Sequence, residues 1–143
     1  MAITRPVTKT IISTVNFGIP VADTVNQHDI DIAALKPTAW VPLSLQNGWV
    51  THIATPAYRK IGDIVYLRGN VKSGTDGSNM FTMPVGFRPL DTVEMVVFAY
   101  YNYWDFSTVT IRTNGETSAK YHTGTPPTVA ANLGLWQVFY ALG

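Results

Sequence analysis

Residues 57–72 read AYRKIGDIVYLRGNVK, and this stretch decides the fold class. Two runs rich in β-branched and aromatic residues flank Gly62-Asp63, a two-residue signal for a hairpin turn. In the second run, apolar and polar residues alternate with the period of two that a half-buried strand requires. The alternating sets are Val65, Leu67, Gly69 and Val71 against Tyr66, Arg68, Asn70 and Lys72. We therefore expect an antiparallel hairpin of Ala57–Ile61 and Ile64–Lys72 with one buried and one wet face.

Short strands separated by turn signals continue on both sides of this hairpin. The turn signals are Asn47-Gly48, Asp76-Gly77, Asn114-Gly115 and Pro126-Pro127. The further expected strands are 49–53, 80–83, 93–101, 107–113, 119–123 and 135–142. About eight short strands with no helical interval predict an all-β fold, an antiparallel β-sandwich or jelly-roll head over residues 40–143.

The first 39 residues have a different pattern from the head. Residues 3–17 favour an extended segment, and Pro20 is well placed to begin a helix over residues 20–36 that Pro37 ends. Apolar residues and one histidine recur in this helix at alternating spacings of four and three; they are Val21, Val25, His28, Ile32 and Leu35. This N-terminal seam fits either a short amphipathic helix lying on its own domain or a stub of helical bundle at an oligomer axis.

The composition of the chain argues against several classes of binding partner. The chain has 143 residues, no cysteine and a net charge of +1, and only 13% of its residues are charged. A near-neutral balance argues against a nucleic-acid groove or a polybasic membrane face, and the lack of cysteine excludes disulfides and thiolate metal sites. The opening residues and the longest apolar stretch, Met95 to Tyr101, predict no secretory leader and no membrane span.

No motif for catalysis or cofactor binding is present. The three histidines, His28, His52 and His122, have no second ligand at a metal-binding spacing. There is no GxSxG nucleophile elbow and no glycine-rich phosphate loop. We therefore expect a non-enzymatic protein with no catalytic residue, no cofactor and no metal.

Residues 98–106 (FAYYNYWDF) form an aromatic cluster. Alternation places Phe98, Tyr100, Asn102 and Trp104 on one face and Tyr101, Tyr103 and Asp105 on the other. A core needs only one of these faces, and the second, with two tyrosine hydroxyls and a carboxylate, suits a subunit interface or a sugar-stacking site. If residues 102–105 form a loop instead, an exposed Trp104 favours recognition. The candidate glycan, receptor or interface residues are Tyr101, Tyr103, Trp104 and Asp105.

The last nine residues, LWQVFYALG, predict an apolar strand over residues 135–142. A chain end frays unless it is paired in a sheet. The apolar side chains of this strand therefore place it in the middle of a sheet or at a subunit interface.

The order of several segments resembles a known family. Residues 40–49 (WVPLSLQNGW), 56–75 (PAYRKIGDIVYLRGNVKSGT) and 80–89 (MFTMPVGFRP) occur in the same succession as in β-sandwich heads of tailed-bacteriophage minor tail or receptor-binding virion proteins. Residues 3–6 (ITRP) and 17–23 (FGIPVAD) also look like the starts of small phage virion proteins.

The resemblance implies a structural virion protein, a homotrimeric appendage on the virion surface, assembled in the host cytoplasm. Residues 1–39 would attach it to other capsid or tail proteins or define the threefold axis, and the head would contact a host-surface glycan. A capsid decoration or head-fibre protein is the alternative within this class. A monomeric, stand-alone carbohydrate-binding module is the alternative from another class.

Overall fold

The computed structural model describes residues 32, 35–100, 104–121, 132–136 and 138–143. The chain divides into two compact units, Met1–Lys36 and Pro37–Gly143. Most of the predicted segment 1–39, including seam positions Val21, Val25 and His28, lies outside the described residues. The other two seam residues, Ile32 and Leu35, are 61% and 63% exposed. The role of the segment stays a prediction.

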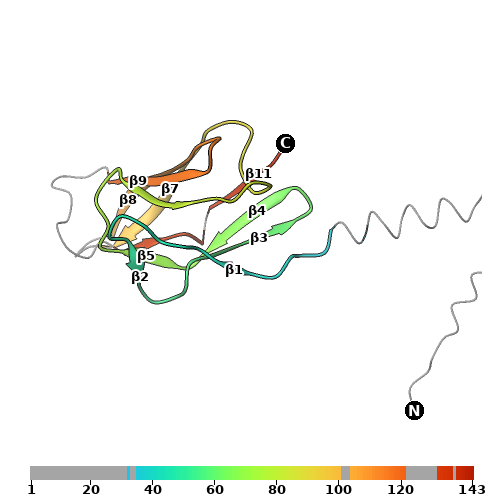
Figure 1. Ribbon diagram of the computed structural model, residues 1–143. Helices are drawn as coiled ribbons and strands as arrows, with labels where there is room; N and C mark the ends of the chain where they lie inside the picture. The colour runs from blue at the N-terminus through green and yellow to red at the C-terminus, as the bar shows by residue number, and fades with distance from the viewer. Residues whose placement is uncertain (1–31, 33–34, 101–103, 122–131, 137) are drawn as a thin grey trace, which may run out of the picture. The chain divides into compact units, whose positions relative to one another are not determined.

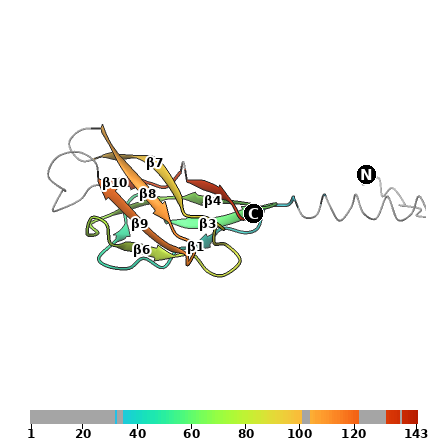
Figure 2. The same ribbon diagram turned by 90° about the horizontal axis from the view of Figure 1, so that it is seen from above.

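The all-β prediction is confirmed. The described part of the chain holds eleven strands rather than about eight: β1 Val41–Pro42, β2 Val50–Thr51, β3 Ala57–Ile61, β4 Ile64–Arg68, β5 Asn70–Lys72, β6 Asn79–Thr82, β7 Val93–Tyr100, β8 Trp104–Ile111, β9 Glu116–Tyr121, β10 Asn132–Gly134 and β11 Phe139–Ala141. They form a four-stranded sheet, β1-β3-β4-β11, and a seven-stranded sheet, β2-β5-β10-β7-β8-β9-β6. Figures 1 and 2 show β7, β8 and β9 lying over the β3–β4 hairpin, as in a β-sandwich.

The predicted hairpin forms as expected, but its second arm is shared between the two sheets. β3 and β4 pair in the register Ile61↔Ile64, closed by Gly62 in the left-handed region. The arm then breaks at Gly69, whose φ is +96° and where a Cβ would lie 2.6 Å from the Cα atom of Pro56. Only glycine tolerates this conformation at such a close approach. Gly69 is therefore the corner at which the chain leaves the four-stranded sheet and enters the seven-stranded sheet as β5.

A second corner corrects the prediction of one continuous strand over residues 135–142. The amide of Leu135 donates to the carbonyl oxygen of Gly69 at 2.9 Å, and the amide of Leu67 donates to that of Val138 at 2.9 Å. These bonds fasten the turn between β10 and β11 to the first corner. β11 lies at the edge of the four-stranded sheet, not in its middle. Tyr140 faces the core, and Phe139 is 58% exposed.

The core lies between the inward faces of the two sheets. It is formed by fully buried apolar side chains from both sheets, among them Val65, Leu67, Val71, Met80, Phe81, Val97, Val109, Ile111 and Leu133. Burial of such a side chain contributes roughly 1.5–3 kcal/mol. Three of these residues are inward positions of the predicted alternation in 64–72, which the structure therefore confirms.

Two tyrosines bring hydroxyl groups to the margin of this core. The Tyr140 hydroxyl donates to the carbonyl oxygen of Phe87, whose ring meets Tyr58 edge-on at a centroid distance of 4.8 Å. Burial, with a smaller contribution from Tyr58, raises the pKa of Tyr140 well above the ordinary tyrosine value. Burial, helped by the negative charge of Asp76, raises the pKa of Tyr121 to about 12.

No helix among the described residues is long and apolar enough to cross a membrane. No group of three or more histidine or acidic side chains gathers among them in a way that could hold a metal ion.

The first prediction concerns Trp49, a core residue that is 3% exposed. Its indole lies against Gly74, so that a Cβ at position 74 would overlap the ring. Gly74→Ala is expected to destabilise the head by about 3 kcal/mol in urea unfolding, because the indole must shift within a packed core. Gly77→Ala is the control: it has open space around its Cβ but a φ of +72°, and it should cost about 1 kcal/mol. Equal losses in the two variants would contradict this packing.

The second prediction concerns alkaline pH. The folded state raises the pKa of Tyr140 and Tyr121 above the unfolded value of about 10. Their contribution to stability is therefore complete below pH 10 and is lost as the pH rises towards about 12. The free energy of unfolding should therefore fall between about pH 10 and pH 12. Tyr140→Phe should weaken this dependence while costing about 1 kcal/mol at pH 8 for the lost hydrogen bond. A variant with the full pH dependence of the wild type would contradict this account.

Candidate functional site

The outer face of β7 and β8 carries aromatic side chains exposed to solvent. In β7, Val97 and Ala99 are buried, whereas Phe98 and Tyr100 are 48% and 49% exposed. Phe106 on β8 is directly opposite Phe98 and is 52% exposed, and their ring centroids are 5.7 Å apart. Large aromatic rings at half exposure on one sheet face are typical of a recognition surface rather than of a core.

This arrangement differs from the expectation for the aromatic cluster. The sequence suggested Tyr101, Tyr103 and Asp105 on one face, together with Trp104 if it lay in a loop, as the candidate surface. In β7 it is the face of Phe98 and Tyr100 that is exposed. Tyr101 and Tyr103 lie outside the described residues. Trp104 and Asp105 belong to β8 rather than to a loop, and their backbones pair with Tyr100 and Ala99. Their assignment as site residues stays a prediction.

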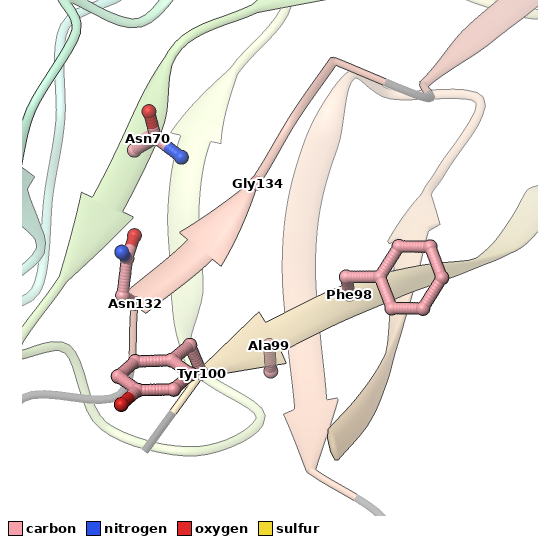
Figure 3. A pocket seen from close by; sticks show the side chains of 6 residues that line it. All are labelled: Asn70, Phe98, Ala99, Tyr100, Asn132 and Gly134. Atoms are coloured by element: carbon pink, nitrogen blue, oxygen red, sulfur yellow. The ribbon is translucent and has the colours of Figure 1, made fainter. Parts of the chain in front are cut away.

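A pocket of about 570 Å³ opens beside this aromatic face. Figure 3 shows its lining, which comes from three adjacent strands: Asn70 of β5, Asn132 and Gly134 of β10, and Phe98, Ala99 and Tyr100 of β7. We call it the sheet pocket. β10 pairs with both neighbours, placing Gly134 opposite Asn70 and Asn132 opposite Tyr100. Three segments far apart in the chain therefore meet in one depression.

Gly134 keeps the sheet pocket open. A Cβ built there would point towards the Asn70 Nδ2 atom at 3.7 Å and the Trp136 Cδ1 atom at 3.9 Å. Any larger side chain at this position would fill the space between the two asparagines. Trp136, which is 59% exposed, lies close to the same position. The lining of the depression thus combines two carboxamides with the aromatic side chains of Phe98 and Tyr100.

The polar groups of the sheet pocket are neutral. They are two carboxamides and the phenol of Tyr100, and none of the six lining residues carries a carboxylate, ammonium, guanidinium or imidazole group. The Oδ1 atom of Asn132 is buried and accepts no hydrogen bond from the described residues. An unpaired buried acceptor costs about 1–3 kcal/mol, and a ligand that donates a hydrogen bond would relieve this cost if the carboxamide of Asn132 turned its Oδ1 atom into the pocket.

None of the six lining residues was among the site residues expected from the sequence, although Phe98, Ala99 and Tyr100 lie in the aromatic cluster. Alternation in the hairpin places Asn70 on the solvent-exposed face, and this was the sequence pattern from which Asn70 could have been identified as a surface residue. Asn132 and Gly134 belong to a three-residue strand whose partners are 32 to 64 positions away, and no local pattern gives that pairing. Of the histidines, His52 is not one of the lining residues, although its amide donates to the carbonyl oxygen of Asn70 at 3.0 Å. His28 and His122 lie outside the described residues.

Comparison with known proteins bears on the fold. No family model matches the chain, and no curated protein matches it. Among solved structures it is similar to the head domain of the lactococcal phage bIL170, a structure reported in the context of a common fold for the receptor-binding domains of lactococcal phages. The TM-score is 0.59 at 17% identity, over 73% of this chain and 97% of the other. The resemblance to phage β-sandwich heads is therefore confirmed at the level of fold: residues of this chain adopt the fold of a phage receptor-binding head domain.

Proposed function

We propose that this chain is a non-enzymatic structural protein of a tailed-phage virion and that its head binds a host-surface glycan in the sheet pocket. The observation that carries the proposal is a neutral pocket of aromatic rings and carboxamides on a fold shared with a phage receptor-binding head. Fold likeness by itself is an analogy. The chemistry of the pocket gives the analogy a physical basis.

The chemistry of the lining suits a saccharide. Each carboxamide both donates and accepts hydrogen bonds, as each sugar hydroxyl does. The faces of Phe98 and Tyr100 offer apolar area for the C–H face of a pyranose ring. General acid–base catalysis depends on a titratable group poised against the substrate, and the neutral lining is better suited to holding a sugar than to cleaving one. Trp104, Asp105, Tyr101 and Tyr103 adjoin Tyr100 in the sheet or in the chain, and we propose that they extend this surface.

In this proposal, the N-terminal segment 1–39 holds three copies of the chain together and attaches them to the virion. Three copies would join along the seam of Val21, Val25, His28, Ile32 and Leu35, and the segment would dock on other capsid or tail proteins at the virion surface. Ile32, Leu35 and Phe139 support this, since each is more than half exposed in a single chain. Exposed apolar side chains of this size are favoured where an assembly covers them.

Two other functions remain as alternatives to the receptor-binding role. A capsid decoration protein would use the same trimer without a glycan in the sheet pocket. A stand-alone carbohydrate-binding module would use the sheet pocket as a monomer, and the lining of the pocket by a single chain favours it. The likeness to a receptor-binding head supports the first function over both.

The third prediction tests the sheet pocket with an array of bacterial cell-surface glycans. Tyr100→Ala and Asn132→Ala should each weaken binding of the full chain by about tenfold or more, because truncating a central aromatic or polar anchor costs at least about 1–2 kcal/mol. Val96→Ala is the control: Val96 is 64% exposed on the same strand but outside the pocket lining. Unchanged glycan affinity in both pocket variants, each shown to be folded, would contradict the assignment.

The fourth prediction tests the assembly. The full chain should have three times its monomer mass of 15.7 kDa in sedimentation equilibrium. The double substitution Ile32→Glu, Leu35→Glu should shift it towards monomer, because charges would then face one another in the seam. Deletion of residues 1–39 should abolish incorporation into particles and leave a folded head. A monodisperse monomer for the full chain would contradict the trimer and favour the carbohydrate-binding module.

A further inference from the structure

A second cluster of polar and aromatic side chains lies on the outer face of the four-stranded sheet. In the β3–β4 register, Tyr58 and Leu67 form the pair that faces the core, so the adjacent pairs Ala57↔Arg68 and Arg59↔Tyr66 lie on the outer face. Val41 of β1 pairs with Tyr58, which places the preceding residue, Trp40, on the same face as Arg59. Trp40, Arg59 and Arg68 together are called the Trp40 cluster.

Both guanidinium groups of the Trp40 cluster are held against one indole ring. The Cζ atoms of Arg59 and Arg68 each lie 4.5 Å from the ring centroid of Trp40. The two carbons are therefore at most 9.0 Å apart, twice that distance. Stacking on the ring favours each cation by itself, but it also brings two like charges close together. An anion bound close to both guanidinium groups would offset their mutual repulsion.

No group in the described part of the chain neutralises this pair. Neither guanidinium forms an ion pair or a side-chain hydrogen bond with another described residue. The Nε atom of Arg59 is buried and has no acceptor. Asp63, at the β3–β4 turn, is five residues from Arg68 along β4, a separation of about 16 Å at the rise of a strand. Only 13% of the residues of the chain are charged, and within the described ranges these two arginines have no carboxylate in an ion pair with them.

We propose that the Trp40 cluster is an oxyanion-binding site, which takes a phosphate or carboxylate group between Arg59 and Arg68. A guanidinium stacked on an aromatic ring keeps its N–H donors in its own plane, where they bind the two oxygens of such a group in bidentate fashion. The indole restricts both side chains before the anion arrives, which reduces the ordering cost of binding. A bound anion would also remove the repulsion between the two cations.

The site is independent of the sheet pocket, because the two are built on different sheets and share no residue. Its ligand is either a free ion or an anionic group carried on a larger molecule such as a phosphodiester polymer. Both supply the same chemistry to the arginines. The alternative is that Arg59 and Arg68 only hold Trp40 on the sheet and bind no anion.

The test is an NMR titration of the full chain with inorganic phosphate, following the Nε–Hε signals of the arginines at constant ionic strength. We expect saturable shifts of the Arg59 and Arg68 signals. Arg68→Gln should weaken the affinity by about tenfold, and Arg68→Lys, which keeps the charge but not the fork of donors, should also weaken it. Arg112→Gln is the matched control, since Arg112 bonds to Ser118 on the other sheet, and it should leave phosphate binding unchanged.

Two results would overturn the proposal: shifts that grow linearly without saturating, or an affinity that is the same in the Arg68 variants and in the wild type. Tyr100→Ala should leave phosphate binding intact, so failure of this site is distinguishable from failure of the glycan site. A second titration with a poly(glycerol phosphate) chain identifies the source of the anion. Affinity per phosphate about tenfold above that of the free ion assigns the site to a polymer, and equal affinity assigns it to the free ion.

Discussion

Successive side chains of a β-strand leave the sheet on opposite faces, and this period of two determines where every candidate site of the head can lie. Val97 and Ala99 are buried between the sheets, so Phe98 and Tyr100 between and beside them must face outwards. Burial of Leu67 has the same consequence for Tyr66 and Arg68 on the other sheet. The energy of core burial thus sets the position of side chains that take no part in the core.

The two corners between the sheets bring the parts of the sheet pocket together. Gly69 directs the chain from β4 into β5, and the turn after Gly134 directs it from β10 into β11. The corners are joined through the bond from the Leu135 amide to the Gly69 carbonyl oxygen. β10 is therefore positioned between β5 and β7. Because Gly134 has no Cβ atom, space remains between Asn70 and Asn132. The sheet pocket therefore exists because the chain passes from one sheet to the other at these two corners.

Local pattern predicted the strands well and the long-range pairing poorly. The β3–β4 hairpin, the inward positions Val65 and Leu67 and the all-β class follow from alternation and turn residues, which act over a few positions. The break at Gly69 depends on a close approach to Pro56, and the edge position of β11 depends on its pairing with β4. The aromatic cluster was recognised, but alternation alone does not decide which of its faces is exposed, because both faces are apolar enough to be a core and only the partner sheet decides between them.

The central claim is that the outward face of β5, β10 and β7 holds the ligand, whereas the inward face only stabilises the fold. The most direct measurement is a map of backbone amide shifts in the full chain as a bound cell-surface saccharide is titrated in. The account predicts perturbations concentrated at Asn70, Asn132, Gly134 and the end of β7. Perturbations confined to the four-stranded sheet, with these amides unchanged at saturation, would contradict it.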